Sequence, residues 1–209
     1  NLPKNNLMKR LLILVFLVLA AYLSYVFIFK KKGGDSGPKQ QPLALKKHSE
    51  AFSKSIADAM NAYFEMKAAF VDADIAKAKE GCKKFISLID SIKLDELKND
   101  TASIFETAKA NFNDVKLNAV SLLNQTDITE MRQDFRMISE MLYPAFKVIN
   151  YEGPKMYWQN CPMAFGDEKE GNWISNSEEI INPYLGKNHP EFKGTMLHCG
   201  SIKDTIKAQ

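Results

Sequence analysis

The chain has 209 residues, of which 45% are hydrophobic and 25% are charged. This composition is typical of a globular protein and excludes a fully disordered or fibrous chain. The net charge is +3, from 28 basic and 25 acidic residues, and so small an excess argues against nucleic acid as the main ligand. The length allows one or two ordinary domains.

The N-terminal part contains an uncharged apolar segment, Leu11–Phe29, of 19 residues. As a helix it would span roughly 28 Å, close to the thickness of a bilayer's hydrocarbon core. The alternative is a cleaved signal peptide, but Ala20-Ala21 is followed by more apolar residues instead of an A-x-A cleavage pattern. We therefore expect residues 1–30 to be an uncleaved anchor, with a cleaved signal as the alternative.

Basic residues flank both sides of this segment in similar number, so the positive-inside rule gives no orientation. The tail before this segment is short and can remain in the cytoplasm, which favours export of the larger C-terminal part. We therefore expect an inner-membrane anchor with the soluble part in the periplasm. Residues 31–43 are rich in Gly, Ser, Pro and Lys and predict a flexible linker, so the folded part begins near Ala44.

Residues 44–150 contain four segments in which apolar residues recur at helical spacing. Ser49, Asp74 and Asp127 precede three of these segments and are expected to be their N-caps. Short polar links between the segments favour an all-α fold, a four-helix up-down bundle. Pro144 falls inside the last segment, which predicts a kink or an early end of that helix.

Some residues in this region resemble metal ligands, but core packing explains them better. Cys82 lies on an apolar stripe and is expected to be buried as a small hydrophobe. The methionines of the helices form no continuous strip and are expected to fill the core. His48 is expected to be exposed at the start of the first helix.

Helical periodicity is lost in the C-terminal segment, residues 151–209. It contains four of the eight prolines, both tryptophans and two of the three cysteines. We expect an irregular segment wrapped against one end of the bundle, with Trp158 and Trp173 packing it onto the helices.

Soft donor atoms are concentrated near both ends of this segment. Cys161 and Met163 stand at one end, and Met196, His198 and Cys199 stand at the other. Thiolates and thioethers favour Cu(I) or Ag(I) over hard cations. The two cysteines equally fit a disulfide, which would close a loop of about 38 residues and contribute about 3–4 kcal/mol. Spacing alone leaves both interpretations open, while the lack of C-x-x-C argues against structural zinc.

Four short motifs stand out in this segment: Tyr157-x-x-x-Cys161-Pro-Met-Ala, Trp173-x-Ser175, Ile181-Asn-Pro-Tyr-x-Gly186 and Met196-Leu-x-Cys199-Gly. Together with Arg132-x-x-Phe135-x-x-Ile138-Ser139-x-x-Leu142 in the helical part, they resemble an exported bacterial domain of unknown function, over about residues 55–200. That domain is found alone and at the C-terminus of copper/silver efflux adaptor subunits of the RND type. The resemblance implies an exported module that binds copper or a similar soft metal, with efflux adaptor or pump components as partners. The chain departs from the signature by His198 and by the insert Lys187–Lys193.

Sequence motifs of enzymes are lacking: there is no Gly-rich phosphate loop, nucleophile elbow, paired histidine or redox C-x-x-C. We therefore expect no enzymatic activity. The leading hypothesis is a membrane-tethered periplasmic module that binds Cu(I) or Ag(I) and serves copper efflux or homeostasis. The alternative is a disulfide-stapled extracytoplasmic interaction domain without metal.

Overall fold

The computed structural model describes residue 22, residues 47–100 and residues 102–207. The chain divides into two units, Asn1–Gln41 and Pro42–Gln209, and every element named below belongs to the second. Apart from Tyr22, the predicted anchor Leu11–Phe29 and the linker 31–43 lie outside the described residues. Among the helices that are described, none is both long enough and apolar enough to cross a membrane.

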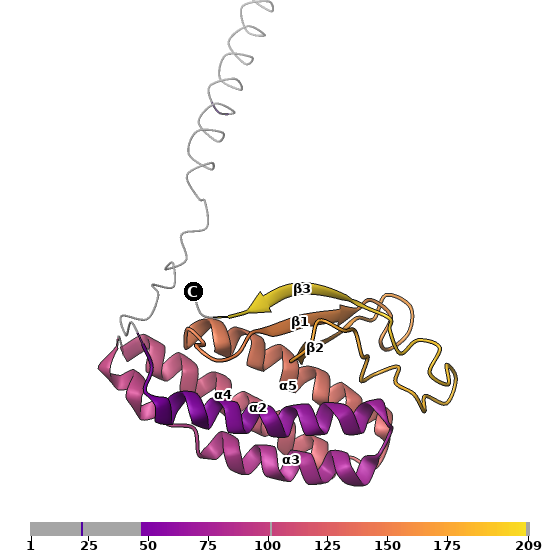
Figure 1. The fold of residues 1–209 in the computed structure, drawn as a ribbon, viewed down its shortest axis with the longest axis horizontal. Helices are drawn as coiled ribbons and strands as arrows, with labels where there is room; N and C mark the ends of the chain where they lie inside the picture. Colours follow the sequence, from indigo (N-terminus) through magenta and orange to yellow (C-terminus); the bar gives the residue numbers. More distant parts are fainter. Residues whose placement is uncertain (1–21, 23–46, 101, 208–209) are drawn as a thin grey trace, which may run out of the picture. The chain divides into compact units, whose positions relative to one another are not determined.

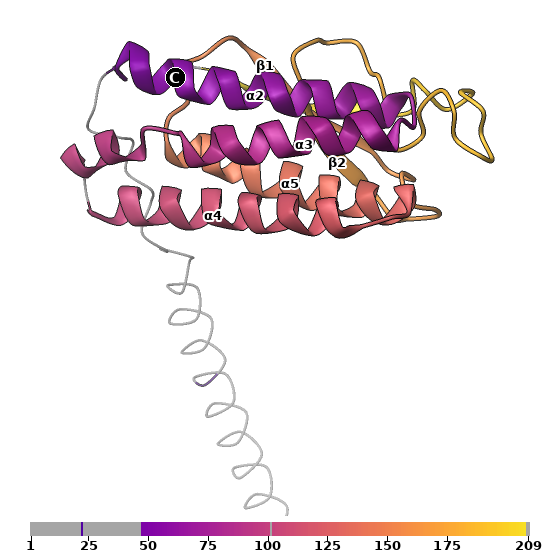
Figure 2. The same cartoon turned by 90° about the horizontal axis from the view of Figure 1, so that it is seen from below.

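The four predicted helices are confirmed and pack side by side (Figure 1), and Figure 2 shows α3 between α2 and α4. A short 3-10 helix, η1, stands between α3 and α4. The bounds are α2 Glu50–Val71, α3 Ile75–Asp90, η1 Leu94–Asn99, α4 Ala102–Asn124 and α5 Ile128–Val148.

All three predicted N-caps are confirmed. The side chains of Ser49, Asp74 and Asp127 accept hydrogen bonds from backbone N–H groups in the first turns of α2, α3 and α5. These bonds satisfy donors that a helix start leaves without partners. Helix α5 continues through Pro144 to Val148, so the expected early end is not found.

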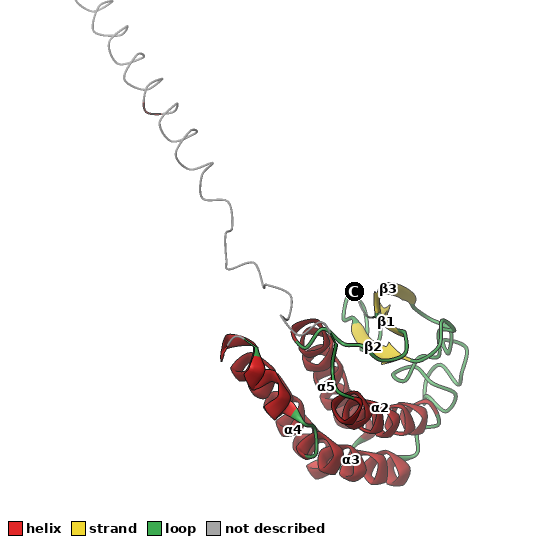
Figure 3. Ribbon diagram, turned by 60° about the vertical axis from the view of Figure 1, so that its left-hand side comes forward, coloured by secondary structure: helices red, strands yellow, loops and turns green. Residues whose placement is uncertain are grey.

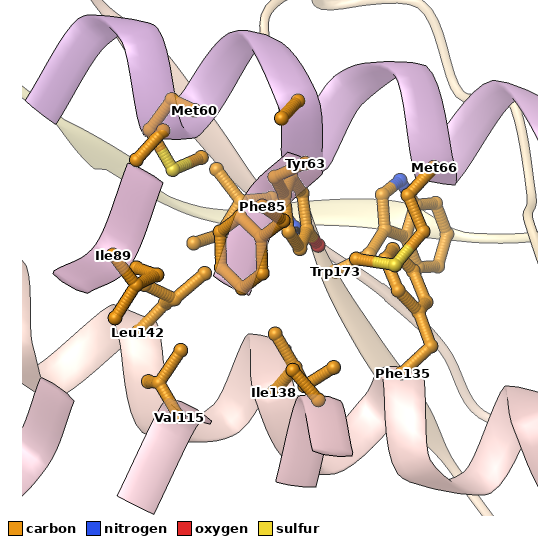
Figure 4. Close-up of a cluster of buried hydrophobic side chains, with 14 of the residues drawn as sticks. Met60, Tyr63, Met66, Phe85, Ile89, Val115, Phe135, Ile138, Leu142 and Trp173 are labelled. Carbon is orange, nitrogen blue, oxygen red and sulfur yellow. Dashed lines mark hydrogen bonds between the residues drawn. The ribbon is translucent and has the colours of Figure 1, made fainter. Parts of the chain in front are cut away.

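The core lies between the helices and also receives side chains from the C-terminal segment, among them the fully buried Trp173 (Figure 4) and Tyr184. Cys82 is fully buried there, as predicted, and its thiol donates to the carbonyl oxygen of Ala119 at 3.2 Å.

The expectation for His48 was wrong, because its ring is buried at the junction of three elements. Its Nδ1 lies 3.0 Å from a carboxylate oxygen of Glu96 in η1, and its Nε2 lies 2.6 Å from the carbonyl oxygen of Ile149 after α5. The ring also stacks on Phe52. His48 thus ties the start of α2 to η1 and to the end of α5.

The C-terminal segment is only partly irregular, because its loops connect three short strands, and this corrects the all-α prediction. It forms a three-stranded antiparallel sheet of β1 Met156–Cys161, β2 Gly171–Ser175 and β3 Ser201–Ile206, in the order β2-β1-β3. The sheet lies along the flank of the bundle beside α5 and α2 and not against one end (Figures 1 and 3).

Strand β2 is the part of the sheet that contacts the helices most closely. The N–H of Ile174 donates to the hydroxyl oxygen of Tyr63 in α2 at 3.1 Å, and that hydroxyl lies 2.7 Å from the hydroxyl of Ser139 in α5. Trp158 of β1 stacks on Tyr143 of α5 with ring centroids 4.6 Å apart. Polar bonds and aromatic packing therefore hold the sheet on the seam between α2 and α5, and both tryptophans take part as expected.

The Tyr63 hydroxyl is expected to contribute about 2–3 kcal/mol to stability. The substitution Tyr63→Phe leaves almost no cavity but removes the acceptor for the buried N–H of Ile174, and an unsatisfied buried donor costs about 1–3 kcal/mol. Urea unfolding at constant m-value measures the loss. The control Tyr157→Phe removes a hydroxyl that bonds the exposed carboxylate of Glu178 and should cost below about 1 kcal/mol. Equal losses in both variants would contradict this role for Tyr63.

Candidate functional site

The structure brings Cys161 and Cys199 into contact, with their sulfur atoms 2.7 Å apart. Cys161 ends β1, and Cys199 is separated from the start of β3 by Gly200. In the β1–β3 register Asn160 lies opposite Ser201, so the next residues along each strand's extension, Cys161 and Gly200, also meet. Strand pairing therefore positions the two thiols, although they are 38 residues apart in the sequence.

Gly200 is what allows this close approach. Its φ is +144°, and a Cβ at this position would lie 2.7 Å from the carbonyl oxygen of Asn160 and 3.0 Å from the Trp173 ring. A side chain would therefore push Cys199 away from β1. The Cys199-Gly200 pair of the sequence motif thus has a steric reason.

The two thiols differ in exposure. Cys161 is fully buried and Cys199 is half-buried, so Cys199 provides the solvent-facing side of the pair. Burial, together with the adjacent Cys161 thiol, raises the pKa of Cys199 to about 12. Cys199 is therefore a neutral thiol at physiological pH, and it becomes a ligand only if binding of a cation displaces its proton.

The sulfur separation differs from that of both arrangements expected from the sequence. A disulfide bond is about 2.05 Å long, whereas two sulfurs on one metal ion at bond lengths near 2.3 Å lie roughly 3.5–4.5 Å apart. At 2.7 Å the two sulfur atoms are closer than non-bonded sulfurs pack, and the separation is nearer to the disulfide length than to that of two sulfurs on a metal ion. If the two sulfur atoms approached each other by about 0.7 Å, they would be at the length of a disulfide bond. If they separated by about 1–2 Å, a metal ion could bind between them.

The other predicted donors lie on the same two segments. Met163 and Met196 are both half-buried and pack against the core, two residues after Cys161 and three before Cys199. His198 is exposed, and its Nδ1 lies 2.8 Å from the carbonyl oxygen of Ile180. Within the described part of the chain, no three His, Cys, Asp or Glu side chains gather as a metal-binding group. The thiol pair is therefore the centre of the candidate site.

Asn182 connects the loop before the insert to the Cys199 backbone. It is fully buried, and its Nδ2 donates to the carbonyl oxygen of Cys199 at 2.9 Å. Its own N–H donates to the carbonyl oxygen of Leu197 at 2.8 Å. In the sequence, Asn182 was recognised as part of a motif but was given no role. The sequence did contain a signal for that role, because an Asn followed by Pro is typical of a turn stabilised by the Asn side chain.

Lys67 was also missed, and it is a buried cation. It lies on α2 only 9% exposed, and its Nζ donates to the hydroxyl of Ser175 in β2 at 3.0 Å. Burial lowers the pKa of Lys67 to about 8. A signal was present in the sequence, because Lys67 stands four residues after Tyr63 and three before Phe70, on the apolar face of the helix.

Residues 59–152 match the model of a family described as a protein of unknown function (DUF3347). The match runs from the middle of α2 to just beyond α5, which is less than half of the chain, and it ends before β1. It supports the resemblance to a domain of unknown function for the helical body. The Cys161 and Cys199 motifs lie outside the matched residues. No curated protein and no solved structure matches the chain.

Proposed function

We propose that the protein is a metal-binding module that holds a soft monovalent cation, Cu(I) or Ag(I), between Cys161 and Cys199. The observation that carries the proposal is the contact of these two sulfur atoms at 2.7 Å. Thiolate sulfur is the ligand type that selects soft cations. Two thiolates on one monovalent cation would together carry a single net negative charge, which lowers the cost of burying them partly.

Access from one side and further soft atoms nearby support this proposal. The half-buried Cys199 offers a path for an entering ion, while the buried Cys161 shields the other side from water. Met163 and Met196 lie on the same two segments, within three residues of the thiols. They are proposed as auxiliary thioether ligands, and His198 as a further donor through its Nε2, since its Nδ1 is engaged by Ile180.

The proposed setting is the periplasmic face of an inner membrane, to which Leu11–Phe29 would tether the module. An association with copper efflux or homeostasis, through efflux adaptor or pump components, is supported by the similarity of the motifs described above. We propose no catalytic role.

Titration of the reduced protein with Cu(I) against a competing chelator tests the proposal. One ion per chain is expected, with an affinity that increases at least about tenfold per pH unit between pH 6 and pH 8, because Cys199 must release its proton. If both cysteines release a proton on binding, the Cu(I) affinity should increase about a hundredfold per pH unit. A site made of thioethers alone would show no such slope. Binding without pH dependence, or no binding, contradicts the proposed thiolate site.

A second candidate is a disulfide clasp without metal, and the same short sulfur separation favours it. A bond between Cys161 and Cys199 would join the end of β1 to the residues before β3 across a 38-residue connection. Thiol counting after isolation without reductant separates the candidates. One free thiol per chain, that of Cys82, indicates the clasp, and three free thiols that bind Cu(I) indicate the metal site.

A further inference from the structure

Asn182 makes four hydrogen bonds with its side chain and backbone N–H, and these bonds join two segments. The amide Oδ1 accepts from the backbone N–H groups of Tyr184 and Leu185, at 2.8 and 3.0 Å, within its own turn. The amide Nδ2 and the backbone N–H both point to the other segment, where they donate to Cys199 and Leu197. Oδ1 thus fixes the orientation of the side chain, and Nδ2 uses that orientation to hold Cys199.

We propose that Asn182 is the positioning residue of the thiol pair, because its amide holds the backbone of Cys199 opposite Cys161. The importance of this role for metal binding rests on the proposed function, but the geometric role itself does not. Asparagine suits the position because one amide supplies an acceptor to the turn and a donor to Cys199 at the same time.

The turn that carries Asn182 is itself attached to the helical body. Pro183 follows Asn182, fixes its own φ and has no N–H, which favours a turn stabilised by the Asn182 side chain. The guanidinium of the buried Arg132 in α5 donates to the carbonyl oxygen of Pro183 at 3.2 Å and to that of Phe70 in α2 at 3.1 Å. A continuous series of hydrogen bonds therefore connects α2 and α5 through the turn to Cys199.

The role of Asn182 can be measured by thiol–disulfide exchange in the full chain. Cys161 and Cys199 together lose two hydrogen atoms to oxidised glutathione, which leaves as two molecules of reduced glutathione, while one S–S bond forms in the protein. The equilibrium constant gives the effective concentration of one thiol at the other. It reports on their relative placement without any metal.

The substitution Asn182→Asp retains the acceptor for Tyr184 and Leu185 and removes the donor to Cys199. We expect the effective concentration to fall at least about tenfold, because one hydrogen bond of typical strength is lost and a carboxylate oxygen then faces the carbonyl oxygen of Cys199. The matched control is Asn188→Asp, which removes a bond of the same type and length, from Nδ2 to the carbonyl oxygen of Asp72 at 2.9 Å. This bond does not involve the thiol pair, so we expect a change below about twofold.

The possible results separate this inference from the proposed function. An unchanged exchange equilibrium in a folded Asn182→Asp protein overturns the positioning role, even if Cu(I) binds. Suppose that the effective concentration falls tenfold in Asn182→Asp while the wild-type protein binds no Cu(I). This result supports the positioning role and refutes the metal site. If Asn182→Asp does not fold, Asn182→Ser takes its place, because its hydroxyl keeps a turn acceptor without a new charge. It should show the same fall, and an unchanged equilibrium would again overturn the role.

Discussion

Replacement of both Cys161 and Cys199 by serine is expected to weaken Cu(I) binding by the reduced protein at least about 1,000-fold. Loss of an outer-shell partner alone typically weakens metal binding about 10–100-fold, and this variant loses both thiolate ligands. Serine hydroxyls are hard, neutral donors that do not replace thiolates for a soft ion. Competition with a Cu(I) chelator at pH 7 measures the change.

Two kinds of control make this result specific. Cys82→Ser removes the third thiol, which is buried and donates to Ala119, and it should leave Cu(I) affinity unchanged. Met163→Leu and Met196→Leu retain the side-chain volume and remove one thioether each, so they should weaken binding by less than about tenfold. If the double serine variant holds Cu(I) as well as the wild type does, the copper proposal is wrong. A loss of about 3–4 kcal/mol of stability under oxidising conditions, with no effect on metal, would instead indicate the clasp.

The substitution Lys67→Met is expected to stabilise the fold by about 2 kcal/mol at pH 7. Burial lowers the pKa of Lys67 from 10.5 to about 8, so the charged form destabilises the folded state by about 3 kcal/mol. Methionine retains the length of the apolar stem, and the loss of the bond to Ser175 offsets about 1 kcal/mol of the gain. The partner left behind is a neutral hydroxyl that still accepts from the N–H of Ser177, so no unpaired charge remains.

The gain should depend on pH in one direction. Between pH 8 and pH 10.5 the unfolded wild-type chain keeps the Lys67 proton while the folded chain has lost it. Wild-type stability therefore rises with pH across this window, relative to the variant, and the advantage of Lys67→Met disappears. Urea unfolding at pH 7, 9 and 10.5 measures this trend. Lys84→Met, at an exposed ion pair with Glu65, is the control and should change stability by less than about 0.5 kcal/mol. A destabilised Lys67→Met protein at pH 7 would contradict the argument.

A buried lysine with a lowered pKa is a feature that clusters at functional sites, and here it lies at the contact of α2 with β2. Ser175, its hydrogen-bond partner, belongs to the Trp173-x-Ser175 part of the sequence motif. The motif residues thus have separate structural tasks: Ser175 meets α2, Asn182 holds Cys199, and Gly200 permits the thiol contact.

The sequence by itself determined the four helices and their starts. Helical periodicity and N-caps depend on residues three or four positions apart, so the signal is local and survives without knowledge of the fold. Ser49, Asp74 and Asp127 illustrate this, since each side chain bonds an N–H two or three residues ahead. The burial of Cys82 followed from the same periodicity.

The strands were missed because the usual alternation of polar and apolar residues is absent from β1 and β2. Both strands are buried on both faces, and nearly every residue of each is buried, including the polar Gln159 and Asn160. A two-residue period appears only where one face meets water. His48 was misjudged for a related reason, since its partners Glu96 and Ile149 are distant in the sequence.

Only the tertiary structure decided that Cys161 and Cys199 meet. The sequence supplied the two thiols and the soft atoms near them, but their contact depends on the pairing of β1 with β3 and on the amide of Asn182. It decided equally that Lys67 is buried, because the charge of a lysine on a helix is hidden only when another element, here β2, covers it. Both outcomes arise from contacts between residues far apart in the chain, which local pattern and composition do not encode.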